Sequence, residues 1–195
     1  MQLRPAFDAL LDIDDALGDV VARATEPALA AIKLAWWRER LQELDEGKAP
    51  AEPRLQAAAQ ELLPRGLCGT GLAGIEDGWA LLLDENPDLE SAAERGARLF
   101  DMASSLLGKA DPLIEPAGEL FVLAGLRRRG LVAGHHPPSL DRLANHRFAR
   151  ELRPLTALAA LAARDLSRGG PPFEPEATPG RALALLRHRL TGRVA

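Results

Sequence analysis

The chain has 195 residues, of which 47% are apolar, so it can bury a sizeable core and we expect one domain over residues 1–195. A net charge of −4 gives no general attraction to nucleic acid, and we expect no nucleic-acid partner. The single cysteine excludes an internal disulfide. Because no apolar run reaches ~18 residues and no signal-peptide core is visible, we expect a cytoplasmic protein.

Apolar residues recur with a helical period, and no stretch alternates as a strand would. The segments between the periodic stretches are rich in Pro and Gly, as turns are. The pattern therefore predicts an all-α fold with at least seven helices. The expected helices lie near residues 5–23, 26–47, 51–65, 70–85, 88–108, 115–130, 139–151, 154–168 and 178–190.

The first expected helix carries four aspartates on one face. Asp8, Asp12, Asp15 and Asp19 fall within about 60° of one another at 100° per residue. Carboxylates one turn apart, such as Asp15 and Asp19, can share a Mg²⁺ ion whose other ligands include substrate phosphate oxygens. The alternative is a solvated acidic face, which the pattern alone favours.

The second expected helix, EPALAAIKLAWWRERL over residues 26–41, has two apolar stripes. Its adjacent Trp36 and Trp37 point about 100° apart. We therefore expect this helix to contact neighbours on two sides, with each indole in a different interhelical contact. Lys33 and Arg40 lie between the stripes and either extend to the surface, which composition favours, or point into a polar interior. The stripes consist of Ala30, Leu34, Trp37, Leu41 and Leu44, and of Leu29, Ile32 and Trp36.

Four other motifs give weaker signals. Gly69–Gly74 spells GxGxxG, but no strand precedes it, so we interpret it as a loop between helices. His135 and His136 are expected in a solvated loop, and Cys68 has no neighbour that would make it a nucleophile. Residues 127–129, all arginine, suit a charged helix end, although such a run can also bind phosphate.

The segment EPALAAIKLAWWRERLQELDEG resembles the second helical segment of the squalene/phytoene synthase family, in the branch with an RLxWWRxxL signature. The similarity continues through EDGWALLL, ERGARLFDMASSLLG and AGELFVLAGLRRRG and covers most of the chain. It implies an isoprenoid-synthase-like helical bundle around a central cavity. In that family two Asp-rich helices hold Mg²⁺ against prenyl diphosphates, which the enzymes join head to head.

The resemblance also implies roles for individual residues. Asp15 and Asp19 match the first DxxxD motif as metal ligands, with Asp12 or Asp14 as the adjoining acid. Lys33 matches a basic position before the tryptophans. If the family geometry holds, Lys33 or Arg40 pairs with the Asp12, Asp15 and Asp19 face. The diphosphate would be bound by Lys33, Arg40, Arg128 and Arg129.

The second Asp-rich motif is not matched. In GELFVLAGLRRR, Gly118 and Arg128 agree with the family pattern, but Val122, Gly125 and Arg129 replace its Gln, Asn and Asp. The chain also lacks the tyrosines that such synthases use. We therefore expect a degenerate protein that binds a prenyl diphosphate or other isoprenoid lipid without condensing it. An active prenyltransferase with an altered second site and a non-enzymatic assembly factor or helical scaffold are the alternatives. A protein partner and a peripheral membrane contact also stay open.

Overall fold

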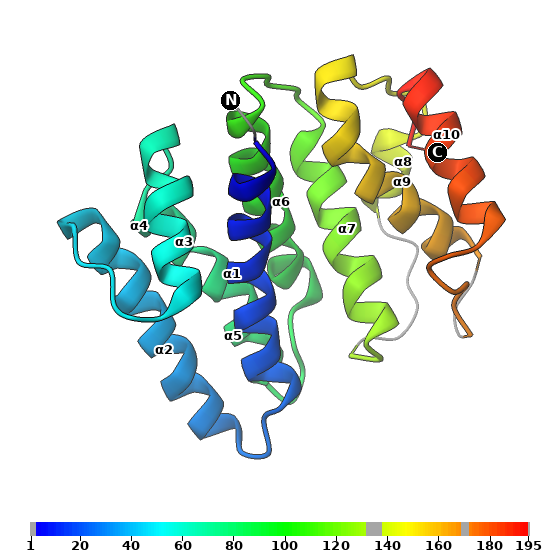
Figure 1. The fold of residues 1–195 in the computed structure, drawn as a ribbon. Coiled ribbons are helices and arrows are strands. Elements are labelled where there is room, and N and C mark those ends of the chain that lie inside the picture. Colours follow the sequence, from blue (N-terminus) through cyan, green and yellow to red (C-terminus); the bar gives the residue numbers. More distant parts are fainter. Residues whose placement is uncertain (1–2, 132–137, 169–171, 195) are drawn as a thin grey trace. The chain divides into compact units, whose positions relative to one another are not determined.

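The computed structural model describes residues 3–131, 138–168 and 172–194 (Figure 1). These residues form helices and contain no strand, which confirms the all-α prediction and the expectation of at least seven helices. The chain divides into two compact units, Met1–Arg95 and Gly96–Ala195, and each is described by itself. The single domain over residues 1–195 stays a prediction. His135 and His136 lie outside the described residues.

The first unit is built from short and medium helices that pack around α1. The α-helices are α1 (Arg4–Ala22), α2 (Pro27–Glu43), α3 (Pro53–Glu61), α4 (Gly69–Ala73) and α5 (Ile75–Ala80). Single 3₁₀ turns follow three of them, at Leu44–Glu46, Leu63–Arg65 and Leu81–Leu83. Helix α1 contacts α2, α3 and α5 through a buried face that includes Leu10, Ile13 and Leu17. The boundary between the units falls within α6 (Leu89–Leu106).

The second unit contains α7 (Ile114–Arg128), α8 (Pro138–Leu143), α9 (Arg153–Ser167) and α10 (Pro179–Thr191). A 3₁₀ turn, Arg150–Leu152, leads into α9. Helix α9 lies between α7 and α10 and contacts both (Figure 1). Gly96 and Gly118 let the α6 and α7 backbones touch, because a Cβ on either glycine would overlap the other's carbonyl group.

Proline marks where several helices begin. Pro27, Pro53 and Pro179 each stand in the first turn, where the missing N–H group has no helical partner to lose. The Oγ1 of Thr178 accepts a hydrogen bond from the Arg181 N–H group, which caps α10. Because these signals are local, most of the predicted helix starts agree with the structure.

Two of the predictions for individual segments were wrong. The segment Gly69–Gly74 was expected as a loop, but its residues Gly69–Ala73 form α4. A Cβ on Gly69 would overlap the Leu41 carbonyl group of α2. The helix expected over 139–151 stops at Leu143, because the residues that follow bond to other segments. The His146 imidazole lies 2.9 Å from an Asp111 carboxylate oxygen, and Phe148 donates its N–H group to the Gly192 carbonyl oxygen.

Only one of the two stripes of α2 is buried. The stripe that contains Trp37 faces α1, α4 and α5, and all five of its members are buried. The other stripe is exposed, with 47% of Leu29, 67% of Ile32 and 43% of Trp36 accessible to solvent. The prediction that Trp36 fills a second interhelical contact is therefore wrong, since the neighbours of α2 in this unit all pack on the Trp37 side.

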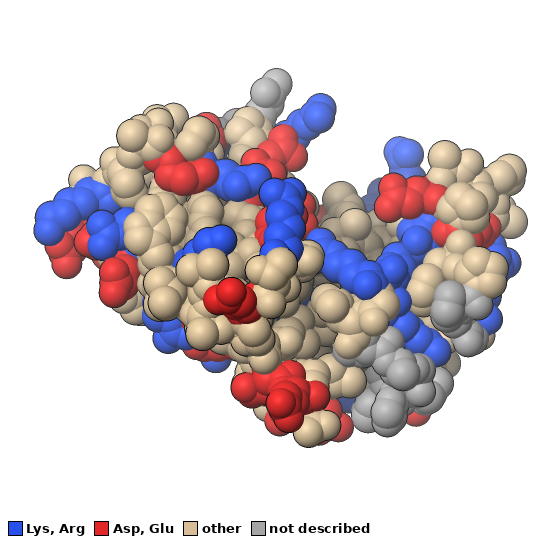
Figure 2. Space-filling model, turned by 90° about the horizontal axis from the view of Figure 1, so that it is seen from below, with Lys and Arg blue, Asp and Glu red and all other residues tan. Residues whose placement is uncertain are grey.

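Charge on the surface is mixed. The face in Figure 2 shows Lys and Arg side chains interspersed with Asp and Glu, in keeping with 24 basic and 28 acidic residues in the chain. Among the described helices, none combines the length and the apolar character required to cross a membrane.

Candidate functional site

The aspartate face of α1 lies at the surface of the first unit. Asp12 and Asp15 are exposed, and Asp8 and Asp19 pair with arginines one turn away on their own helix. The Asp19 carboxylate lies 3.1 Å from the Arg23 guanidinium. An exposed pair at this spacing stabilises a helix by a few tenths of a kcal/mol. The helical period thus correctly placed these carboxylates on one accessible face.

A pocket of about 270 Å³ opens beside Asp19, where α1 turns into α2. Its charged lining combines Asp19 and Glu26 with Arg23, Lys33 and Arg54, so positive charges outnumber negative charges by three to two. Apolar side chains, among them Leu29 and Trp37, form the rest of the wall. We call this the α1–α2 pocket; its full lining is Ala16, Asp19, Val20, Arg23, Ala24, Thr25, Glu26, Leu29, Ala30, Lys33, Trp37 and Arg54.

The two predicted cations of α2 have different surroundings. Lys33 lines the α1–α2 pocket together with Asp19. Arg40 pairs instead with acids of its own helix, at 2.9 Å from Glu43 and 3.4 Å from Glu39. No ion pair joins either cation to an aspartate of α1 among the residues described, and Asp19 is paired with Arg23. The predicted pair is therefore not formed, although the pocket brings Lys33 and Asp19 to one opening.

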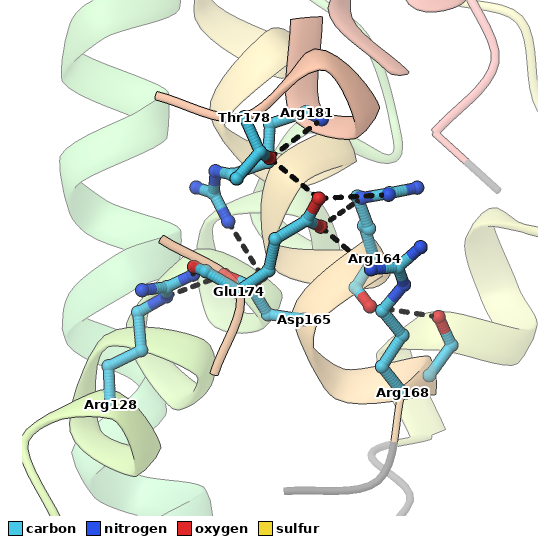
Figure 3. Close-up of polar contacts among 8 residues, drawn as sticks. Arg128, Arg164, Asp165, Arg168, Glu174, Thr178 and Arg181 are labelled. Atoms are coloured by element: carbon cyan, nitrogen blue, oxygen red, sulfur yellow. Dashed lines mark hydrogen bonds and ion pairs between the residues drawn. The ribbon is translucent and has the colours of Figure 1, made fainter. Parts of the chain in front are cut away.

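The predicted diphosphate residues of the second unit lie at the end of α7. Arg129 is exposed. Arg128 donates from Nε to the Asp165 carboxylate at 2.6 Å and from Nη2 to the Glu174 carbonyl oxygen at 2.9 Å (Figure 3). The bond to Asp165 raises the pKa of Arg128 above its ordinary value. Arg128 thus holds α7 to α9 and to the segment before α10.

Two acids organise the contacts around Arg128. Buried Asp165 also accepts a hydrogen bond from the Arg181 guanidinium of α10 at 2.6 Å. Glu174 accepts from Arg164 at 2.7 Å and from the Thr178 hydroxyl at 2.6 Å (Figure 3). These bonds, with that of Arg164 the largest cause, lower the pKa of Glu174 to about 2. The arrangement positions α10 against α9, a role that sequence analysis did not assign to these residues.

The buried polar centre of the first unit was also missed. The Asp14 carboxylate accepts hydrogen bonds from the Trp79 indole at 2.9 Å and from the Arg95 guanidinium. The Arg95 guanidinium lies 3.7 Å from the centre of the Trp79 ring. Helical period carries a signal for this site, because Asp14 falls on the same face as Leu10 and Leu17. A carboxylate in line with buried leucines requires a buried partner.

The GxGxxG segment has a structural explanation. The Asp45 carboxylate accepts hydrogen bonds from the N–H groups of Gly69 at 2.5 Å and Thr70 at 2.8 Å, which satisfies the N-terminus of α4. The bond from the Thr70 N–H group is the largest cause that lowers the pKa of Asp45. The Cys68 sulfur accepts from the Gly71 N–H group at 3.3 Å. Gly69 therefore serves the packing of α4 on α2, and the helix end already has its acceptor.

Few side chains of the described residues are placed to bind a divalent cation. In the described part of the chain, no group of three His, Cys, Asp or Glu side chains is placed to hold a metal ion. Asp15 and Asp19 could supply two carboxylates from adjacent turns of α1. Mg²⁺ is commonly held by one or two carboxylates together with water and substrate phosphate oxygens. An ion held by these two carboxylates would therefore need further ligands from water or from a phosphate group.

Comparison with known proteins adds no relative: no protein-family model, no curated protein and no solved structure matches the chain. The candidate function therefore depends on the residues described above.

Proposed function

We propose that this chain is a squalene/phytoene-synthase-like protein with an isoprenoid-synthase-like fold. It binds a prenyl diphosphate or a related isoprenoid lipid without joining two such molecules. The observation that carries the proposal is the α1–α2 pocket, in which three cations and Asp19 meet an apolar wall that includes Leu29 and Trp37. A diphosphate linked to a hydrocarbon chain has the same combination of a charged head and an apolar body.

The α1–α2 pocket offers the head group two kinds of contact. Lys33 and Arg54 would bind phosphate oxygens directly, and Arg23 could exchange its exposed pair with Asp19 for a phosphate. Asp15 and Asp19 would hold Mg²⁺, which supplies positive charge that offsets the diphosphate. The start of α2 at Pro27 places the positive end of a helix dipole beside the same opening.

Turnover is not proposed, because ionisation of an allylic diphosphate requires positive charge placed accurately around the leaving group. The family holds metal from two acidic helices, whereas α7 presents Arg128 and Arg129 at the corresponding segment. Arg128 is already bound to Asp165 and to the Glu174 carbonyl oxygen. Misplacement of reacting groups by about 1 Å can cost about 10²-fold in rate.

Binding of radiolabelled farnesyl and geranylgeranyl diphosphate, measured by equilibrium dialysis with and without Mg²⁺, tests the proposal. Lys33→Gln should weaken binding about 10-fold, since a charge-assisted contact contributes about 1.5–3 kcal/mol. Arg40→Gln is the matched control on the same helix and should leave binding unchanged, because Arg40 pairs with Glu39 and Glu43. Asp15→Ala/Asp19→Ala should abolish the effect of Mg²⁺.

Three results would change the assignment. Metal-dependent formation of a C30 or C40 product would establish an active prenyltransferase. Equal losses in Lys33→Gln and Arg40→Gln would mean that the α1–α2 pocket is not the binding site. Absence of any diphosphate binding would contradict the proposal and favour a scaffold. The exposed stripe of Leu29, Ile32 and Trp36 on α2 is the observation that supports this second candidate.

A further inference from the structure

Helix α10 exposes a row of leucines. Leu183, Leu186 and Leu190 are 66%, 52% and 69% accessible to solvent. Their spacing of three and four residues places them within about 60° of one another on the helix, so they form one continuous apolar face. We call these three side chains the leucine row.

The opposite face of α10 already holds the helix in place. Arg181 is buried and pairs with Asp165 at 2.6 Å. The buried His188 ring lies 3.0 Å from the Thr156 hydroxyl. At the C-terminal end, Arg153 donates to the Arg189 carbonyl oxygen at 2.7 Å. The leucine row is therefore not required to attach α10 to α9, and its exposure calls for another explanation.

Positive charge flanks the leucine row. On the helix, Arg187 and Arg189 lie on opposite sides of the row, and α10 contains no Asp or Glu. The adjoining residues 147–157 contain three arginines and one acid, Glu151. Within the described residues, no carboxylate pairs with the arginines of this group, which are Arg147, Arg150, Arg153, Arg187, Arg189 and Arg193. In the same unit Arg128, Arg164, Arg168 and Arg181 all have acidic partners.

A groove beside the leucine row combines the same two properties. It has a volume of about 830 Å³ between the start of α9 and the end of α10. Arg150, Arg153 and Arg189 line it together with apolar atoms of Pro154 and Leu185. Arg153 and Arg147 also bond carbonyl oxygens in the last turn of α10, which fixes their positive charge beside the leucine row.

We propose that the leucine row and its flanking arginines form a docking surface for an anionic lipid bilayer. Leucines that point outward between arginines are the pattern of a helix lying in the plane of a membrane surface. The leucines would enter the boundary between headgroups and acyl chains, and the arginines would contact lipid phosphates. A second copy of this face is a poorer occupant, because pairing two such surfaces would bring arginines against arginines. This inference does not rest on the α1–α2 pocket.

Sedimentation of the full chain with phospholipid vesicles tests the surface. Vesicles of phosphatidylcholine alone are compared with vesicles that contain about 30 mol% phosphatidylglycerol. We expect at least about 10-fold stronger binding to the anionic vesicles, and a decrease at high salt as the charges are screened. Leu183→Gln/Leu190→Gln should reduce binding about 10-fold or more, because each leucine loses its apolar contact with lipid.

Matched variants separate docking from general effects. Ile32→Gln removes an equally exposed aliphatic side chain, 67% accessible, from α2 and should leave vesicle binding unchanged. Arg187→Gln/Arg189→Gln should weaken binding to anionic vesicles by about fivefold for each charge. The same change of net charge made with Arg4→Gln/Lys48→Gln, at exposed positions in the first unit, should have little effect. Circular dichroism confirms that each variant is folded.

Several outcomes would overturn the proposal. The unmodified chain could fail to bind anionic vesicles or bind both vesicle types equally. The α10 variants and their controls could also show equal losses of vesicle binding. Absence of vesicle binding together with saturable binding of an acidic amphipathic peptide would assign the leucine row to a protein partner instead. Diphosphate binding that persists in Leu183→Gln/Leu190→Gln would show that the two sites are separate.

Discussion

Removal of the Asp14 carboxylate should destabilise the first unit more than removal of any other aspartate of α1. Asp14 accepts hydrogen bonds from two nearly inaccessible partners, since Arg95 is 4% and Trp79 is 1% exposed. Breaking a buried ion pair by deleting one partner typically costs about 3–5 kcal/mol, because the other charge loses its compensation. The Asp14 side chain is itself 12% accessible, so water can replace part of the contact. We therefore expect Asp14→Ala to lose about 3 kcal/mol, near the lower end of that range.

Urea unfolding followed by tryptophan fluorescence measures this loss directly. The chain has three tryptophans, and all of them, Trp36, Trp37 and Trp79, belong to the first unit. The signal therefore reports on the unit that contains Asp14. Asp12→Ala is the control, since Asp12 is exposed two residues away, and it should change the free energy of unfolding by no more than about 0.5 kcal/mol.

Two further variants identify the cause of the loss. Asp14→Asn keeps an acceptor for the Trp79 indole but removes the negative charge, so most of the loss should remain if compensation of Arg95 dominates. Adding Arg95→Met to Asp14→Ala should recover part of the stability, because it removes the buried charge. An Asp14→Ala chain as stable as Asp12→Ala would refute the reasoning.

Three other predictions concern the second unit. Gly118→Ala should destabilise it by more than about 2 kcal/mol in urea unfolding, because the new methyl group would overlap the Gly96 backbone. The control Gly125→Ala, on the same helix with open space around it, should be neutral or stabilising by up to about 1 kcal/mol. Burial lowers the pKa of His188 below 6.5, so just below pH 6.5 the unfolded chain binds more protons than the folded chain, and the free energy of unfolding should fall as pH drops. A His188→Gln chain that kept the same pH dependence in urea unfolding would contradict this. The pKa of Glu174 is lowered to about 2, with the bond from Arg164 as the largest cause, so the contribution of its carboxylate to stability is complete above about pH 4.5 and is lost as pH falls toward 2. Glu174→Gln should therefore show a smaller decrease in thermal stability over that range, and an unchanged decrease would exclude Glu174 as the cause.

Much of the secondary structure followed from the sequence because its causes are local. Proline in the first turn acts through the backbone of its own residue, so the starts of α2 and α10 could be predicted. The assignment of the apolar residues of α2 to two separate faces also followed from helical period. The candidate site was anticipated in part, since Asp19 and Lys33 lie at one pocket, whereas Arg40 does not line it.

Other features depended on which helices meet, and periodicity does not contain that information. The sequence placed Trp36 and Trp37 on different sides of α2, but only the packing of α1, α4 and α5 on one side decided that Trp37 is buried and Trp36 is exposed. The partners of Asp14 come from residues 79 and 95, far along the chain, and no local pattern specifies them. A helix defines the directions in which its side chains point, whereas burial and charge compensation depend on surfaces that distant segments supply. The sequence by itself therefore determined most of the helices and the faces they present, and the tertiary structure determined which of those faces are covered.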